Sequence, residues 1–343
     1  MSEFNPNMPS ISNGNYFALP FAPEESAVVL LSVPWDVTTS YRPGTARGPD
    51  AILDASLQLD LCDFHNPAGW RKGIGTLETD YTILDTSRRL REEAEKVIIH
   101  LESGGTLEEE YVRRKLRRIN EASEQLNAHV YEEAKKWMAR GKRVGVVGGD
   151  HSVPLGAIRA AAEHEGAIGV LHIDAHADLR EAYEGFSYSH ASIMYNVLAE
   201  VSGVTDLVQV AVRDLCEEEV KRIALDGRIA CFDDAALAAN RFKGMTWDKQ
   251  CAAIIEKLPQ KVYVSFDIDG LDPSNCPSTG TPVPGGISYN EAVYLLAQVA
   301  ESGRRIVGFD LCEVAPDPRG GAWNANVGAR VLYKLCNILL LTP

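Results

Sequence analysis

Carboxylate and imidazole side chains alternate along one short stretch of the chain. Asp174, His176 and Asp178 stand two residues apart and directly follow an apolar run that ends at Ile173. In nearly extended backbone, residues two apart point the same way, so these three side chains can converge on one point. The stretch therefore predicts one half of a metal site.

A second acidic group lies further along the chain. Asp267 and Asp269 follow another β-type run, and Asp272 comes in the Gly/Pro-containing turn after them. His151, within the segment Gly-Gly-Asp-His-Ser, also follows a short apolar run. One ion cannot use so many ligands, so we expect a site for two divalent ions. The expected ligands are His151, Asp174, His176, Asp178, Asp267 and Asp269.

Each of these groups has an ordinary structural explanation when it is taken alone. An Asp-x-Asp pair after a strand usually caps a turn or a helix, and Gly-Gly-Asp-His-Ser can form a tight turn before a helix. Three ligand types at strict spacing serve little structural purpose, and three such groups after three strands favour a metal centre. Four carboxylates and two neutral imidazoles without thiolates favour Mn²⁺ and its neighbours. Two such ions activate water, so hydrolysis is the natural reaction.

The composition narrows the class of partner. The chain has 343 residues, 45% of them hydrophobic, and a net charge of −14. This acidic balance argues against nucleic acid or an anionic membrane as a partner and suits a small or cationic substrate. The seven cysteines show no metal-binding spacing, and no apolar run reaches the ~20 residues of a membrane span. We expect reduced thiols and a cytoplasmic protein.

The expected elements form an α/β protein, a three-layer αβα sandwich with a mainly parallel sheet. In such a sheet, ligands bind at the carboxyl ends of the strands, which is where all the expected metal ligands lie. The strands are expected near residues 27–33, 143–147, 167–173, 207–212, 228–232, 261–266 and 304–311. The helices are expected near residues 50–59, 87–140 with a break at 103–105, 152–164, 190–200, 214–226, 246–257, 288–301 and 323–340.

The chain is expected to form an N-terminal arm, residues 1–26, and a single domain, residues 27–343. A charged helical insertion is expected near 85–140, and its charge run is interpreted as a solvent-exposed helix face with no catalytic role. The polar, aromatic loop at 35–49 is either a binding rim or an ordinary surface loop. Residues 60–85 carry no clear pattern.

At these residues the chain resembles the ureohydrolase family, that of arginase and agmatinase, and is nearest to agmatinase-like members. The similarity rests on the segments 148–152, 174–178 and 265–273, and it extends to the loops 40–49 and 280–286. It covers about residues 27–340 apart from the charged helices. The resemblance implies the arginase fold, two Mn²⁺ ions with Ni²⁺ conceivable, and a homo-oligomer of three or six subunits.

The resemblance also implies a role for each ligand. His151, Asp174, Asp178 and Asp267 would hold one ion. Asp174, His176, Asp267 and Asp269 would hold the other, so Asp174 and Asp267 would bridge the pair.

Two further residues match functional positions of the family. Glu313 would receive the guanidinium group, which suits a planar cation with five donors. His190 would lie near the leaving group and relay protons, and Asp178 would pass a proton to the departing amine. The implied reaction is attack of activated water on the guanidinium carbon, with urea and an amine as products.

Arg180 departs from the arginase pattern and leaves the substrate open. It either faces a substrate carboxylate, as in formiminoglutamase-like relatives, or is a surface arginine paired with Glu181 or Glu184. Agmatine leads a range of candidates that includes guanidino acids and guanidine. The alternatives are a formimino or amidino hydrolase for a carboxylate-bearing substrate and a catalytically silent binding relative.

Overall fold

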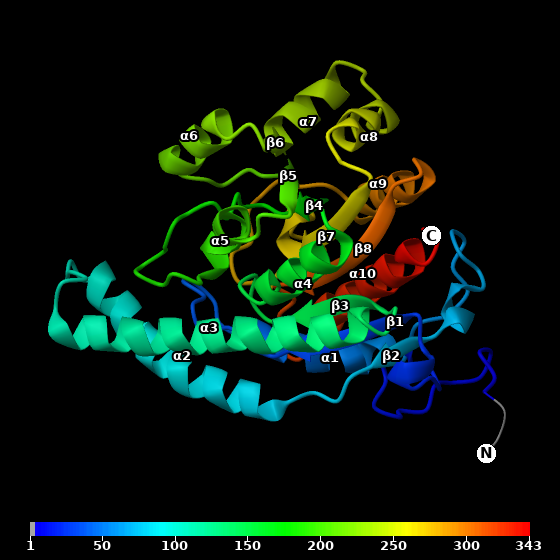
Figure 1. The fold of residues 1–343 in the computed structure, drawn as a ribbon, viewed down its shortest axis with the longest axis horizontal. Helices are drawn as coiled ribbons and strands as arrows, with labels where there is room; N and C mark the ends of the chain where they lie inside the picture. Colours follow the sequence, from blue (N-terminus) through cyan, green and yellow to red (C-terminus); the bar gives the residue numbers. More distant parts are fainter. Residues whose placement is uncertain (1–3) are drawn as a thin grey trace.

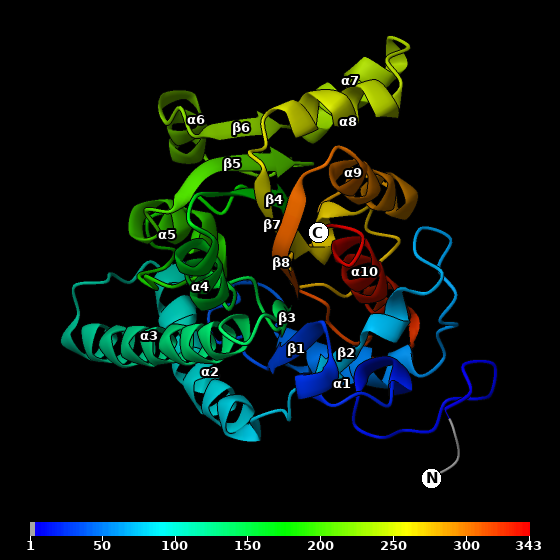
Figure 2. The ribbon, with the colours of Figure 1, turned by 45° about the vertical axis from the view of Figure 1, so that its right-hand side comes forward.

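A parallel β-sheet runs through the middle of the protein. The computed structural model describes residues 4–343, in which the sheet has eight strands in the order β2-β1-β3-β8-β7-β4-β5-β6, every neighbouring pair being parallel. Figure 1 and Figure 2 show this sheet from two directions. The strands are β1 (Val28–Val33), β2 (Ile74–Thr76), β3 (Arg143–Gly148), β4 (Ile168–Ile173), β5 (Val204–Val210), β6 (Ile229–Phe232), β7 (Lys261–Asp267) and β8 (Arg305–Cys312).

Helices cover both faces of the sheet, as the apolar character of the strands requires. In β1, Val28 and Leu30 belong to one core, while Val29 and Leu31 belong to the other. The first core is completed mainly by α1 and α7 to α10, and the second by α2 to α5. The helices are α1 (Gly48–Ser56), α2 (Tyr81–Glu102), α3 (Glu110–Met138), α4 (Leu155–Glu165), α5 (Ile193–Glu200), α6 (Glu217–Leu225), α7 (Asp234–Phe242), α8 (Trp247–Glu256), α9 (Tyr289–Glu301) and α10 (Trp323–Leu339).

The expected fold class is confirmed, with three local differences. β2 lies in a region without a sequence pattern, because an edge strand of three residues is too short to show one. Helix α7 was not expected, since Leu237 is its only buried residue and no apolar stripe marks it. Helix α2 begins at Tyr81, earlier than expected, with Asp80 accepting a hydrogen bond from the Thr82 amide at 2.9 Å.

Two long helices lie beside the part of the sheet that contains β1 and β3 (Figure 1). They are α2 and α3, which pack against each other, and α3 also packs along α4. The charged residues of α3 face solvent while Val112, Leu116 and Ile119 are buried. Among the helices of residues 4–343, none is long and apolar enough to cross a membrane.

Candidate metal centre and substrate cavity

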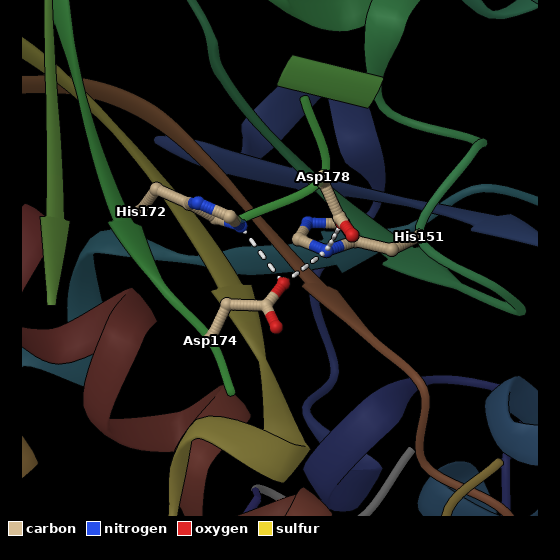
Figure 3. Close-up of side chains that lie close together, drawn as sticks. All are labelled: His151, His172, Asp174 and Asp178. Atoms are coloured by element: carbon tan, nitrogen blue, oxygen red, sulfur yellow. Dashed lines mark hydrogen bonds and ion pairs between the residues drawn. The ribbon is translucent and has the colours of Figure 1, made fainter. Parts of the chain in front are cut away.

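The six expected metal ligands come together at the carboxyl edge of the sheet. His151 follows β3, the segment Asp174–Asp178 follows β4, and Asp267 and Asp269 stand at the end of β7. His151 Nδ1 lies 2.9 Å from Asp174 Oδ2 and 3.3 Å from both Asp178 Oδ2 and Asp267 Oδ2. Figure 3 shows two imidazoles, those of His151 and His172, approaching the Asp174 carboxylate from two sides.

The other half of the site contains His176 and Asp269. His176 Nδ1 lies 3.2 Å from Asp269 Oδ2 and 3.4 Å from Asp174 Oδ1. Asp174 therefore presents one oxygen to each imidazole ligand. The Asp267 carboxylate accepts the Asp269 amide at 2.8 Å, and Asp269 accepts the Ala175 amide at 3.1 Å, so backbone donors hold both carboxylates.

Close backbone packing makes this convergence possible. A Cβ at position 270 would lie 2.7 Å from the Asp174 amide nitrogen, so only glycine allows the Asp269 and Asp174 segments to approach. Asp178 adopts a left-handed conformation with φ of 53°, which turns its side chain back toward His151. Arg213 then ties the segment after Asp269 in place, donating to the Asp269 carbonyl at 2.6 Å and to the Leu271 carbonyl at 3.2 Å.

The buried carboxylates of the site repel one another unless cations lie among them. Burial, together with the neighbouring Asp269 and Asp174, raises the pKa of Asp267 well above its ordinary value. Burial and Asp174 likewise raise the pKa of Asp178 to about 6. The Asp269 Oδ2 atom is buried without a hydrogen-bond partner among the described residues. Divalent cations would remove this repulsion, so the donor set fits the two ions expected from the sequence.

The hydrogen bonds of His151 decide which of its ring nitrogens faces the carboxylates. Ser265 Oγ donates to Asp310 Oδ1 at 3.1 Å, so it accepts from His151 Nε2 at 2.9 Å. The proton therefore belongs to Nε2, and the Nδ1 lone pair is directed at the acidic groups. A lone pair facing carboxylates is favourable only with a cation between them. Without one, Nδ1 takes up a proton: burial lowers the pKa of His151, but the carboxylates, Asp174 foremost, raise it well above its ordinary value.

Glu313 follows β8 beside the metal ligands. Its backbone is left-handed, with φ of 63°, and its amide donates to the Gly149 carbonyl at 2.8 Å. Its Oε1 accepts the His151 amide at 3.0 Å, whereas Oε2 is buried without a partner among the described residues. Burial, followed by the charges of Asp150 and Asp269, raises the pKa of Glu313 well above its ordinary value. A cation bound beside Glu313 would favour its charged form, and the unpartnered Oε2 could then accept hydrogen bonds from that cation.

A cavity of about 260 Å³ opens beside these groups. Its wall includes the metal-site residues His176 and Asp178, together with His190 and Arg180. Ser40 and Tyr41 also line it, so the loop at 35–49, for which a binding rim and an ordinary surface loop were the two alternatives, reaches the cavity. The remaining lining residues are Tyr183, Ala191, Asp214, Leu215, Glu219, Thr281, Pro282 and Val283.

Helices α2 and α3 hold two loops of this cavity. Arg91 of α2 donates to the carbonyls of Val37, at 3.2 Å, and Thr39. Asn120 of α3 donates to the Gly185 carbonyl at 3.2 Å and accepts the Ser187 amide at 3.0 Å. The charged helices, expected to be without chemistry, therefore brace the loops on either side of the cavity.

His190 is neutral in this environment. Burial, followed by the charge of His176, lowers its pKa to about 3. Its amide donates to Thr38 Oγ1 at 3.2 Å, which links it to the loop that carries Ser40 and Tyr41.

Arg180 is engaged by the protein itself. Its guanidinium carbon lies 4.8 Å from the centre of the Tyr183 ring, and its Nε lies 3.8 Å from Glu219 Oε2. The pairing expected with Glu181 or Glu184 is wrong, because the acidic partner comes from the N-terminal turn of α6. Sequence spacing could not show this, since α6 reaches the cavity only through the tertiary fold.

Some buried polar residues of the site were missed by sequence reasoning. His172 carried a signal, because it stands two residues before Asp174 on the same strand face. Gln209 and Asp310 lie within apolar strands far from any ligand in sequence, so no pattern could single them out.

The fold and the site together define a class of protein. A parallel sheet flanked by helices on both faces, with carboxylates and imidazoles gathered at its carboxyl edge, is the architecture of the arginase-like ureohydrolases. Residues 26–337 match the arginase family, and the chain belongs to that family. It is a ureohydrolase-family enzyme that acts on guanidino C–N bonds.

Relatives with stated activities are similar along most of the chain. The N(1)-aminopropylagmatine ureohydrolase of Thermus thermophilus is 34% identical over 311 residues, which cover 90% of this chain and 88% of the relative. The agmatinase of Klebsiella pneumoniae is 31% identical over 306 residues, covering 86% and 82% respectively. Proclavaminate amidino hydrolase from Streptomyces clavuligerus has a similar fold, with a TM-score of 0.72, 24% identity, and coverage of 98% of this chain and 100% of that one.

Proposed function

We propose that this enzyme is a binuclear-metal hydrolase that releases urea and an amine from a small guanidino compound, as agmatinase does. The observation that carries the proposal is the position of His151 Nδ1, within 3.3 Å of oxygens from three separate carboxylates. This arrangement supports one ion held by His151, Asp174, Asp178 and Asp267. A second ion would be held by Asp174, His176, Asp267 and Asp269.

The ions most consistent with this donor set are Mn²⁺, with Ni²⁺ as the alternative, because the ligands are oxygens and imidazoles without thiolates. When bound, such a pair would supply Lewis acidity that lowers the pKa of water to about 7 and so would provide a nucleophile for hydrolysis. The carboxylates of the chain hold the pair in place and neutralise its charge.

Glu313 would bind and orient the guanidinium group. Its unpartnered Oε2 offers an acceptor for a planar cation, and its Oε1 is already held by the His151 amide. The bond ties the guanidinium-binding group to a metal ligand, so substrate and metal are positioned together.

Asp178 and His190 would handle the protons. Asp178 lines the cavity beside the proposed ions, so its carboxylate is placed to pass a proton from the attacking water to the departing amine. His190 lines the same cavity in its neutral form and can exchange protons with water there.

The engagement of Arg180 favours a substrate without a carboxylate. Its guanidinium already stacks on Tyr183 and lies near Glu219, so binding an acid would require breaking these contacts. Asp214 and Glu219 add negative charge to the cavity wall, which suits a cationic substrate such as agmatine. Guanidino acids and guanidine complete the candidate class. The alternative, a formimino hydrolase for an acidic substrate, requires the Arg180 guanidinium in the cavity wall to bind the substrate carboxylate in addition to, or in place of, its contacts with Tyr183 and Glu219.

Elemental analysis followed by a substrate panel tests the proposal. Purified protein should contain Mn²⁺ or Ni²⁺ and should release urea from one or more of agmatine, arginine, guanidinobutyrate, guanidinopropionate and guanidine. Formamide release from a formimino compound would support the alternative instead. Metal-loaded protein that turns over no compound of the panel would indicate a catalytically silent binding relative.

Arg180→Ala separates the two substrate classes. We expect it to lower kcat/KM for an acidic substrate only if Arg180 binds the carboxylate, and to leave the metal content unchanged. An equal loss on agmatine and on an acidic compound would show that Arg180 acts through the cavity wall. Arg159→Ala, at a half-buried arginine paired with Glu200, is the matched control.

Three other expectations stay predictions. They are a homo-oligomer of three or six subunits, a cytoplasmic location, and a division into an arm, residues 1–26, and one domain, residues 27–343, with a helical insertion near 85–140. Light scattering of the purified protein tests the first of them.

A further inference from the structure

Four buried polar side chains lie side by side across neighbouring strands. Gln209 of β5 pairs in register with His172 of β4, His172 with Ser265 of β7, and Ser265 with Asp310 of β8. All four are fully buried. Burying polar groups costs free energy unless hydrogen bonds satisfy them, so a row of four in a sheet core needs a reason. The row lies directly beneath the ends of β4 and β7, where the metal ligands begin.

The contacts of Gln209 decide which ring nitrogen of His172 carries the proton. The side-chain nitrogen of Gln209 lies 2.8 Å from the Ala177 carbonyl and 3.0 Å from His172 Nδ1. Because a carbonyl can only accept, the amide nitrogen must face Ala177, and its second hydrogen then points to Nδ1. His172 Nδ1 is therefore an acceptor, and the ring proton belongs to Nε2.

The proton on Nε2 gives His172 a defined task. Nε2 lies 2.8 Å from Asp174 Oδ2, so the ring donates to this carboxylate (Figure 3). The His176 amide donates to the other oxygen, Oδ1, at 2.5 Å. Donors on both oxygens fix the plane of Asp174, whose Oδ2 also faces His151 Nδ1 at 2.9 Å and whose Oδ1 faces His176 Nδ1 at 3.4 Å.

We propose that Gln209 and His172 are positioning residues that orient Asp174 for both metal ions, and that His172 does not itself bind metal. This inference rests on the metal centre of the proposed function. It explains why Gln209, far from any ligand in sequence, is buried in the core. Outer hydrogen-bond partners of metal ligands typically contribute 10–100-fold to metal affinity.

The first test compares two buried glutamines. Gln209→Leu removes the donor to His172 and puts an apolar side chain of similar size in its place. Gln250→Leu is the matched control, since Gln250 is also buried but lies on α8 and has no side-chain hydrogen-bond partner among the described residues. Metal-free full-length protein is titrated with Mn²⁺ by calorimetry and by competition with a chelator. We expect Gln209→Leu to weaken Mn²⁺ binding by about 10-fold and Gln250→Leu to leave it unchanged.

The second test asks whether His172 is a ligand or a donor. His172→Gln keeps an N–H that can reach Asp174, whereas His172→Phe removes it. We expect His172→Phe to weaken Mn²⁺ binding by up to about 100-fold and His172→Gln to restore most of the affinity. X-ray absorption of the Mn²⁺-loaded wild type and His172→Gln should give the same number of imidazole ligands. Loss of one imidazole in the variant would overturn the proposal, because His172 would then be a ligand.

The possible outcomes distinguish failure of this inference from failure of the proposed function on which it rests. Unfolding temperatures of the metal-free variants identify any that fail to fold. If a His172 variant fails to fold, the Gln209→Leu comparison carries the test. If Gln209→Leu fails to fold, the two His172 variants carry it. A folded Gln209→Leu protein that binds Mn²⁺ as tightly as the wild type would overturn the inference alone. So would an equal loss of affinity in Gln250→Leu. A wild-type protein that binds neither Mn²⁺ nor Ni²⁺ would instead overturn the proposed function.

Discussion

Replacing Glu313 by glutamine tests the guanidinium-binding role without disturbing the fold. The variant keeps an oxygen that can accept the His151 amide, now 3.0 Å from Oε1, and it loses only the negative charge. The unpartnered Oε2 is replaced by an amide group of the same size. The metal ligands are untouched, so both ions should stay bound.

The size of the effect follows from the contacts that are lost. A hydrogen bond to a charged group contributes about 1.5–3 kcal/mol, and a guanidinium can donate two in parallel to a carboxylate. Losing this pair should cost about 3 kcal/mol or more. Since about 1.4 kcal/mol corresponds to a tenfold change in rate, kcat/KM should fall by about 10²-fold or more.

The same substitution should stabilise the metal-free protein. Glu313 has a pKa raised well above 4.5, so the folded state keeps a proton that the unfolded state loses as the pH rises. The carboxyl therefore destabilises the fold above about pH 4.5 and has no such effect below it. Glu313→Gln should unfold at a higher temperature than the wild type at pH 7, with the difference vanishing in acid. If Glu313 had only a structural role, its replacement by glutamine would lower the unfolding temperature at pH 7.

The assay is urea release measured alongside metal content and thermal unfolding. Glu184→Gln is the control, because Glu184, although only half-buried, shares with Glu313 a left-handed backbone, with φ of 55°, and a raised pKa, caused by burial and then by Glu102. Glu184→Gln should leave kcat/KM near the wild-type value. An unchanged kcat/KM in Glu313→Gln with both ions bound would refute the role given to Glu313.

Three other perturbations follow from the structure. Asp267→Asn removes a charge that the proposed ligand set assigns to both ions, so Mn²⁺ affinity should fall at least tenfold in calorimetry; full metal content would contradict the proposed bridging role. Arg91→Ala removes the donors to the loop at 37–39, so KM should rise and the loop should be cleaved faster by a protease, with metal content unchanged; an unaltered KM would show that α2 does not brace the cavity. Asp63 lies 2.7 Å from Lys334 Nζ, and although burial raises its pKa, the lysine and the His65 amide lower it below 3.8. The pair therefore stabilises the fold at neutral pH and loses this contribution as the pH falls through the lowered pKa, so urea denaturation should find Asp63→Asn less stable than the wild type at pH 7 and equal to it in strong acid.

The convergence of the proposed metal ligands could be predicted from sequence because local geometry places these side chains. Asp174, His176 and Asp178 alternate directly after a strand, which places them near one another, although Asp178 also needs its left-handed backbone to turn toward His151. A parallel sheet then brings the ends of its strands to one edge, so His151 and Asp267 could be assigned to the same site. Each step depends on where the strands lie and end, which the pattern of apolar and polar residues predicts. That the charged helices are an insertion into a single domain stays a prediction.

Contacts between segments that are distant in sequence were decided only by the tertiary structure. Glu219 reaches Arg180 because α6 begins beside the cavity, and no spacing along the chain records that position. Gln209 and Asp310 stand beside the expected metal ligands because strand order and register place them there, whereas in sequence each is a polar residue in the otherwise apolar second half of a strand. The sequence by itself determined which side chains could bind metal and at which edge they would gather. The tertiary structure decided which buried hydrogen bonds orient them, because such bonds depend on the register between strands rather than on the order of residues within one.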